Sequence, residues 1–329
     1  MYLRIRNFLR AASCVVVWLS VTLAHAQSTV PGYPSKPIRI LVPFAPGGGA
    51  DLMARIIAPR MSDRLGQTVV VDNRPAASGI VATEMAAHAA PDGHTLLALT
   101  SNHAAHKWMY KKLSFDPAND FEFVTQATIS PLVVVIHPSV PANTMQDFIK
   151  YTRANPAKVN YGSSGPGGPP HLAGEMLNMM AKINMTHIVY KGIAPAITAL
   201  LGNEVQLSFT NVFSGQPHIK SGRLRILGIT SLKRLQSAPD WPTVSEAGVP
   251  GYEASIWYGF ALPAKTPKPI IDVLHKEITA ILNRPEVRQT FESQGGEVVA
   301  GTPQEFTRTF RNDVERLGKV IRAAGIVAE

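Results

Sequence analysis

The sequence predicts an α/β protein built from two doubly wound lobes. Three observations predict this architecture. About 300 residues follow an N-terminal leader, which is longer than a typical single domain. Short β-branched segments alternate with helical segments in two successive runs. Each run also contains a Gly-rich turn between a strand and a helix.

The first 26 residues predict an export signal that is not part of the fold. Three arginines lie among the first ten residues, residues 11–23 carry no charge, and Ala24-His25-Ala26 provides the small residues that a signal peptidase reads. The uncharged run is short for a membrane span of about 20 residues. We therefore expect cleavage near Ala26 and a periplasmic mature chain.

Composition excludes several classes of protein. Cys14, the single cysteine, lies inside the leader, so the mature chain offers neither a disulfide nor a cysteine nucleophile. Residues 1–26 hold three Arg and no acidic residue, so their removal lowers the formal net charge from +9 to +6. The cations are scattered, which together with the export signal disfavours a nucleic-acid partner. The remaining positive charge suits an acidic solute, but a generally basic surface explains it equally well.

The first run of strands and helices predicts a parallel sheet. It starts with a strand at 38–42, which is short, β-branched and ended by Pro43. A Gly-rich turn follows, and residues 50–65 then show the apolar spacing of a helix. We expect a strand at 68–71, a helix at 78–89 and, after the Pro91-Asp92-Gly93 turn, a strand at 95–99.

The second run predicts the other lobe and the return of the chain. Strands are expected at 132–136, 159–161, 205–209 and 224–229, with helices at 145–154, at 171–182 and between the last two strands. Residues 255–262 predict a strand that returns to the first lobe, and helices at 269–282, 285–293 and 303–324 close the chain. Thr302, Pro303 and Glu305 give the last helix a strong start signal. The lobe limits expected from this order are 27–128 with 251–329, and 129–250.

The first Gly-rich turn, at residues 46–49, is the main functional lead. It precedes Asp51 at a helix start, where unpaired N–H groups and a partial positive charge favour an anion. The turn lacks the Lys-Ser/Thr pair of a phosphate loop and the third glycine of a dinucleotide site. Asp51 would repel a phosphate dianion, so we expect a carboxylate, or an amino group paired with Asp51. A turn that only caps its helix is the alternative interpretation.

A second turn, at residues 163–168, repeats this pattern in the other lobe. The hydroxyls of Ser163 and Ser164, with the N–H groups of the turn, are suited to close over a carboxylate from the opposite side. Ser164 does not have glycines two residues away on both sides, so the turn does not predict a serine nucleophile. A flexible turn without a ligand is an equally good interpretation.

The histidines do not predict a metal site. His103 and His106 are three residues apart, but no third ligand lies at metal spacing, so packed or surface histidines are expected. His171 follows the second turn and is a candidate for a hydrogen bond to the ligand, although packing explains it equally well. No carboxylate pair or acid–base cluster is evident, so the sequence predicts neither an enzyme nor a cofactor.

An ordered set of stretches resembles the substrate-binding proteins of the tripartite tricarboxylate transporters, the Bug family. The stretches are 33–40, 42–51, 71–75, 91–96, 160–165, 187–192, 242–248, and 257 with 261–263. Their order is more specific than any one of them. The resemblance covers the chain from about Tyr33 to the last helix. It implies a type II periplasmic-binding-protein fold, in which two crossing strands join the lobes and the ligand lies in the cleft between them.

The resemblance also implies ligand-binding residues. These are Phe44, Ala45, Gly48 and Asp51 in the first turn, Ser163, Ser164 and Gly165 in the second, and the pairs Ser101 with Asn102 and Thr210 with Asn211. We assign the far end of the ligand to His171 and Asn211. Ala45 stands where the family usually has proline, which would loosen the first turn and change the choice of ligand.

The resemblance finally implies a function. The protein would capture a small carboxylate, either a di- or tricarboxylate, an aromatic acid or an amino acid. Its partners would be the membrane permease subunits of a tripartite transporter, and we expect a monomer. A periplasmic sensor that passes the binding signal to a membrane receptor is the alternative.

Overall fold

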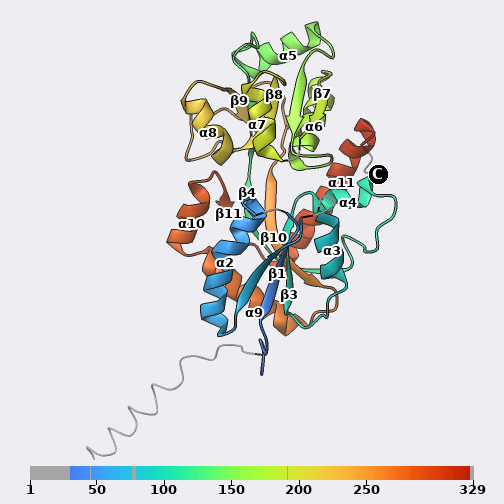
Figure 1. Cartoon of the computed structure of the whole chain (residues 1–329), viewed down its shortest axis with the longest axis vertical. Coiled ribbons are helices and arrows are strands. Elements are labelled where there is room, and N and C mark those ends of the chain that lie inside the picture. The colour runs from blue at the N-terminus through green and yellow to red at the C-terminus, as the bar shows by residue number, and fades with distance from the viewer. Residues whose placement is uncertain (1–29, 45, 76–78, 191, 327–329) are drawn as a thin grey trace, which may run out of the picture.

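The computed structural model describes residues 30–44, 46–75, 79–190 and 192–326. The expected export signal, residues 1–26, lies outside this part of the chain. The chain forms two lobes, each built around one β-sheet, that follow one another along the long axis of the molecule (Figure 1). The predicted α/β fold with two lobes is confirmed.

The first sheet has the strand order β11-β4-β10-β3-β1-β2. Its strands are β1 (Ile38–Val42), β2 (Val69–Asn73), β3 (Thr95–Thr100), β4 (Phe121–Ser130), β10 (Ile256–Pro263) and β11 (Glu297–Val298). The helices of this lobe are α2 (Gly49–Leu65), α3 (Ile80–Ala87), α4 (His103–Met109), α9 (Lys268–Leu282), α10 (Pro285–Glu292) and α11 (Pro303–Ala324).

The second sheet has the strand order β7-β6-β8-β5-β9. Its strands are β5 (Leu132–Ile136), β6 (Asn160–Ser163), β7 (Thr186–Val189), β8 (Leu207–Asn211) and β9 (Arg225–Ile229). The helices of this lobe are α5 (Met145–Ala154), α6 (Pro169–Ala181), α7 (Ile193–Leu201) and α8 (Val212–Lys220).

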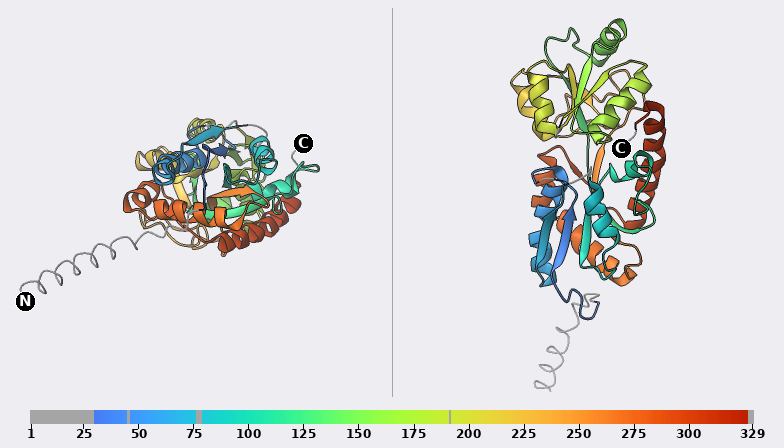
Figure 2. Two further views of the ribbon diagram at one scale, coloured as in Figure 1. Left: turned by 90° about the horizontal axis from the view of Figure 1, so that it is seen from below. Right: turned by 45° about the vertical axis from the view of Figure 1, so that its right-hand side comes forward.

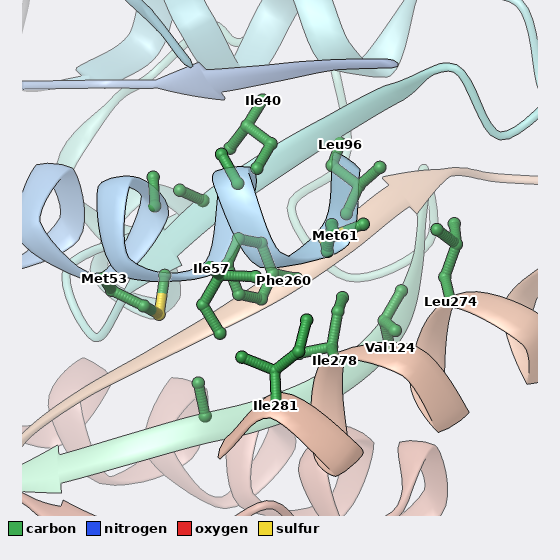
Figure 3. Close-up of a cluster of buried hydrophobic side chains, with 14 of the residues drawn as sticks. Ile40, Met53, Ile57, Met61, Leu96, Val124, Phe260, Leu274, Ile278 and Ile281 are labelled. Atoms are coloured by element: carbon green, nitrogen blue, oxygen red, sulfur yellow. The ribbon is translucent and has the colours of Figure 1, made fainter. Parts of the chain in front are cut away.

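Apolar cores lie on both faces of each sheet, because successive strand residues point to opposite faces. In the first lobe Ile40 belongs to the cluster of α2 and α9, whereas Leu41 belongs to the cluster of α3, α4 and α11. Figure 3 shows Ile57 of α2 and Ile278 of α9 on either side of Phe260 of β10. The second lobe repeats this arrangement, with α5 and α6 on one face and α7 and α8 on the other.

Both sheets are mixed. The strands of the first run, β1, β2 and β3, pair in parallel as expected. In the first sheet β10 runs antiparallel to β3 and β4, and in the second β5 runs antiparallel to β8 and β9. The reason is that these two strands enter their sheets from the neighbouring lobe. β5 follows β4 after Pro131, and β10 brings the chain back, so each runs opposite to strands that end at the junction.

Several elements have the limits expected from the sequence, namely β1, β5, α5 and α11. Sequence patterns did not predict β4, β7, β11, α4 or α7. The lobe limits at residues 128 and 250 stay predictions.

Across the described ranges, every helix is too short or too polar to cross a membrane.

The C-terminal helix α11 links the two lobes. It packs against α4 of the first lobe and α6 of the second, and Val320 joins the core of the second lobe. Arg316 donates a hydrogen bond of 2.7 Å from Nη1 to the carbonyl of Glu253, in the segment that leads back into β10. Figure 2 shows α11 along one side of the molecule, reaching from the first lobe toward the second.

Candidate functional site

The parallel strands of both lobes end at edges that face each other. In the first sheet β10 begins at Ile256, opposite Ser130 at the end of β4, and runs antiparallel to β3. The carboxyl end of β3 therefore lies where the chain leaves for the second lobe. In the second sheet Leu132, at the start of β5, pairs with Asn211 at the end of β8, and β6 runs parallel to β8. The segments after β1, β3, β6 and β8 thus face the junction, the position where open α/β sheets bind ligands.

The first turn is held from inside by the carboxylate of Asp51, which is only 3% exposed. The Gly47 N–H donates to Oδ2 at 2.9 Å, Arg55 Nε donates to both carboxylate oxygens at 3.0 Å, and Asn73 Nδ2 donates to Oδ1 at 2.9 Å. Burial by itself raises the pKa of Asp51, but the hydrogen bonds from Arg55, Gly47 and Asn73 outweigh it and hold this pKa below its ordinary value. Asp51 is therefore an ionised anchor at neutral pH.

Asn73, at the end of β2, ties the neighbouring strand to the same turn. Its amide nitrogen also donates to the carbonyl of Phe44 at 3.0 Å, and its Oδ1 accepts from Arg55 Nη2 at 3.0 Å. Sequence reasoning assigned no role to Asn73 or Arg55. The signals were present, because Arg55 lies four residues after Asp51 on one helix and Asn73 lies in a stretch that resembles the family.

The helix that follows the first turn begins without a side-chain cap. Gly48 is the N-cap residue of α2, and no side chain donates or accepts a capping hydrogen bond there. The preceding Gly47 has φ +89°, in the left-handed region that favours glycine. A helix that starts without a capping side chain leaves its first N–H groups to other acceptors, and an anion is a suitable one. Ala45 lies outside the described residues.

Tyr258 of β10 packs tightly against this turn. A Cβ built on Gly49 would overlap the Tyr258 hydroxyl, so only glycine permits this contact. Burial raises the pKa of Tyr258 to about 12, so its hydroxyl stays protonated. Tyr258 was missed by sequence reasoning, which placed Trp257 but not its neighbour in the family pattern. A crossing strand thus supplies a hydroxyl beside the first turn.

Ser101 and Asn102 follow β3 at the same edge and are buried. The Ser101 N–H donates to the carbonyl of Trp257 at 3.2 Å, which fixes this segment to the crossing strand. Thr100 Oγ1 is hydrogen-bonded to Asn102 Oδ1. The segment therefore lies at the junction, and its backbone and the Asn102 side chain are bonded to protein neighbours.

The second turn is held by two histidines. Ser163 Oγ, at the end of β6, is hydrogen-bonded to His187 Nε2 at 2.6 Å and accepts from the Gly165 N–H at 3.2 Å. The Gly167 N–H donates to His171 Nδ1 at 2.9 Å. The two imidazoles stack on each other, with ring centroids 3.7 Å apart. His187 was not among the expected site residues, although it lies in a stretch that resembles the family.

Fewer N–H groups are available in the second turn than the sequence suggested. Pro169 and Pro170 open α6 and carry no N–H, and the glycine N–H groups at 165 and 167 have internal partners. Ser164 is half-buried, and no partner of its hydroxyl is found among the described residues. Ser164 is thus the group of this turn best placed to bind a ligand.

Thr210 and Asn211 end β8 beside the second turn. Asn211 Oδ1 accepts from the Ser214 N–H at 2.7 Å and so caps α8. Thr210 is fully buried, and its hydroxyl has no hydrogen-bond partner among the described residues. The structure therefore places all the described site candidates at the junction, but Asp51, Ser163, His171 and Asn211 have protein partners that shape the site.

His103 and His106 lie in α4 and are packed, as the sequence suggested. Both are buried, and His103 contacts Phe115, Phe121 and Phe310. Burial lowers the pKa of His103 to about 3. No group of three metal-binding side chains occurs in the ranges that the structure describes.

We expect the protein to lose stability as the pH falls below about 6.5, the ordinary pKa of histidine. Burial, and then the neighbouring His187, lowers the pKa of His171 to about 3, and burial lowers that of His187 to about 4. The unfolded chain therefore binds protons in a range where the folded chain does not. The contribution of these two histidines to the free energy of unfolding is fully present above pH 6.5 and declines toward pH 4.

This decline is measured as the thermal midpoint against pH between 6.5 and 5, above the range in which most carboxylates titrate. The double variant His171→Asn, His187→Asn should show a flatter slope than the wild type. His88→Asn, on an exposed site, is the control. Equal slopes in the wild type and the double variant would contradict the assignment of these histidines as neutral.

Comparison with known proteins identifies the family. Residues 53–326 match the tripartite tricarboxylate transporter family receptor, TctC. The chain belongs to this family. Protein BugT of Bordetella pertussis is 32% identical over 321 residues, which cover 97% of this chain and 98% of BugT.

Two solved structures of TctC-like proteins share the fold over most of this chain. R. palustris Rpa4515 with adipate has a TM-score of 0.82 and 33% identity, covering 90% of this chain and 99% of that one. MatC (Rpa3494) from Rhodopseudomonas palustris with bound malate has a TM-score of 0.78 and 29% identity, covering 88% and 100%. The resemblance inferred from the sequence is confirmed. The TctC family comprises binding proteins of transporters rather than enzymes.

Proposed function

We propose that this protein captures a small carboxylate-bearing solute between its two turns. The observation that carries the proposal is the position of two opposed polar turns at the junction, each braced by internal hydrogen bonds. The related structures named above contain adipate and malate, both dicarboxylates. We infer that the uncapped start of α2 binds one carboxylate, with Ser164 approaching from the other lobe.

Specific residues are assigned by this proposal. Phe44, Gly48, Ser101, Asn102, Ser164, Gly165 and Thr210 line the ligand, together with Ala45. Four further residues keep the turns in shape and contact the ligand with those of their polar atoms that have no protein partner. They are Asp51, Ser163, His171 and Asn211. A ligand that touches both lobes favours the closed arrangement over the open one. A few charge-assisted hydrogen bonds of about 1.5–3 kcal/mol each suffice for micromolar affinity.

The biological setting follows from the family. We propose export to the periplasm with cleavage near Ala26, a monomeric mature protein, and transfer of the solute to the membrane permease subunits of a tripartite transporter. Membership of a transporter receptor family favours this role over the sensor alternative.

The test is a thermal-shift and calorimetric screen of the refolded protein against aliphatic dicarboxylates, citrate, aromatic acids, amino acids and neutral sugars. Refolding removes any solute that is retained during purification. A carboxylate at 100 times its dissociation constant should raise the unfolding free energy by about 2.7 kcal/mol. A shift with sugars alone would contradict the carboxylate proposal.

Replacing Ser164 with alanine should weaken binding of that carboxylate about tenfold, since one charge-assisted hydrogen bond is lost. Its hydroxyl braces nothing in the described structure, so the thermal midpoint of the free protein should not change. Ser163→Ala should weaken binding and also lower the midpoint, because His187 loses its partner. Ser237→Ala, an exposed serine, is the control. Full affinity in both Ser163→Ala and Ser164→Ala would exclude the second turn.

A further inference from the structure

A groove lies on the second lobe, away from the two turns. It has a volume of about 390 Å³, within the size range of ligand pockets. One wall is α5, with Gln146, Lys150 and Arg153, and the other is formed by the end of α6 and the loop of residues 248–250. Figure 1 shows α5 at the far end of this lobe. The carboxyl end of α6 is opposite to its start at the second turn, and a helix of 13 residues separates them by roughly 20 Å.

The floor of the groove is apolar and its rim is basic. Ile149 and Val249 are buried beneath the opening, and Met180 borders it. Lys150 and Arg153 are exposed on the rim. Arg153 is pre-oriented, because its Nη2 donates to the carbonyl of Ala181 at 2.6 Å. The groove therefore combines a site for an apolar side chain with two cations that can accept negative charge, of which Arg153 is held in place.

Among the described residues the rim cations have no ion-pair partner. The acid of α5 is Asp147, whose pKa is lowered first by its hydrogen bonds with Thr144 and Asn143 and to a smaller extent by the charge of Lys150. No carboxylate forms an ion pair with Lys150 or Arg153. Asp147 of α5 is used in the helix cap with Thr144, and Glu175 of α6 accepts from Tyr161 at 2.6 Å. The two cations are left for an external partner.

The charge of the whole chain is also concentrated in this lobe. Residues 132–250 hold ten Lys and Arg against five Asp and Glu. The rest of the chain after residue 26 holds 19 Lys and Arg against 18 Asp and Glu. A partner with negative charge is thus drawn to the second lobe rather than to the first.

We infer that this groove docks an acidic segment of a protein partner, one that carries carboxylates on both sides of an apolar anchor side chain. The apolar side chain would rest on Ile149 and Val249, and its flanking carboxylates would pair with Lys150 and Arg153. A lipid headgroup satisfies the cations but leaves the apolar floor unused, so the floor favours a protein segment. The inference does not depend on which solute the junction binds.

The test uses a labelled synthetic peptide that alternates glutamate and leucine, with a glutamine-for-glutamate peptide as the neutral probe. We expect the acidic peptide to bind the intact protein, and the double variant Lys150→Glu, Arg153→Glu to bind it at least about tenfold more weakly. Lys220→Glu with Arg223→Glu is the matched control, since it changes the charge of the same lobe equally at exposed positions elsewhere. The control should keep at least half of the affinity.

Three outcomes would overturn the inference. The first is equal binding by the wild type and the Lys150, Arg153 variant. The second is an equal loss of affinity in the control variant Lys220→Glu, Arg223→Glu, which would indicate general attraction by charge. The third is binding of phosphatidylglycerol vesicles, lost in the double variant, without binding of the acidic peptide, which would assign the groove to a membrane surface. Thermal midpoints of the variants establish that each is folded.

Discussion

Replacing Asp51 with alanine is expected to weaken carboxylate binding by roughly 30- to 100-fold, the largest effect of any single change at the junction. The carboxylate accepts hydrogen bonds from Gly47, Arg55 and Asn73 while almost fully buried. Its removal leaves these donors without an acceptor beside the start of α2, where we propose that the ligand carboxylate binds. The first turn then relaxes, and the N–H groups of α2 lose their alignment.

The measurement is titration calorimetry with the carboxylate found in the screen, beside circular dichroism to show that the variant is folded. Asp51→Asn keeps one acceptor oxygen but not the charge, so an intermediate loss is expected. Asp63→Ala, at an exposed site near the end of the same helix, is the control. Unchanged affinity in Asp51→Ala would show that the first turn does not need this anchor.

The ligand series also separates two roles of Asp51. If the Asp51 carboxylate pairs with the amino group of an amino acid, Asp51→Ala weakens the binding of amino acids much more than the binding of acids without an amino group. If it only braces the turn, both classes lose affinity equally. The three donors around its oxygens, namely the Gly47 N–H, Arg55 Nε and Asn73 Nδ2, favour the second result.

The elements that sequence reasoning located well are those whose determinants are local. Residues 132–136 form one uninterrupted apolar run, and all of β5 is buried. Both α5 and α11 start with a capping box, formed by Thr144 with Asp147 and by Thr302 with Glu305. Such signals lie within four residues of one another, so a single sequence displays them.

The missed elements depend on distant partners. β4 contains the buried polar residues Thr125, Gln126 and Thr128, which obscure an apolar pattern. Thr125 Oγ1 is satisfied by the carbonyl of Gly301, 176 residues away. β7 is an edge strand with an exposed first and last residue, so its four residues show no alternation. Neither feature is visible before the fold is known.

The same distinction applies to the site. The sequence located both turns and the helix starts behind them, because glycines and hydroxyls are local signals. It did not indicate that Asn73 supports Asp51 or that His187 supports Ser163, since these pairs are 22 and 24 residues apart. It also overestimated the N–H groups of the second turn, although Pro169 and Pro170 were visible. The network that fixes the turns is a property of the tertiary structure.

Replacing Asp313 with alanine is expected to lower the free energy of unfolding by about 2–3 kcal/mol, because a buried polar cluster loses its centre. Asp313 Oδ2 accepts from the indole N–H of Trp257 at 2.5 Å, and Oδ1 accepts from Arg316 Nη2 at 2.8 Å. Trp257 is 2% exposed, so its indole N–H would have no access to water. The Arg316 side chain is 36% exposed, which reduces the part of the loss that is due to its charge.

The loss of stability should exceed the loss from breaking any surface ion pair. It should involve both lobes, because α11 carries Asp313 and because Arg316 of the same helix donates a hydrogen bond to the carbonyl of Glu253. Thermal unfolding of the free protein measures it, and the midpoint should fall by about 5 °C. Asp313→Asn should lose about half as much, because the amide oxygen still accepts from Trp257. Asp272→Ala breaks an exposed pair with Lys268, so its midpoint should stay within 1–2 °C of the wild type, roughly the effect of 0.5 kcal/mol. If Asp313→Ala changed the midpoint no more than Asp272→Ala does, the link between the crossing strand and α11 would contribute no net stability.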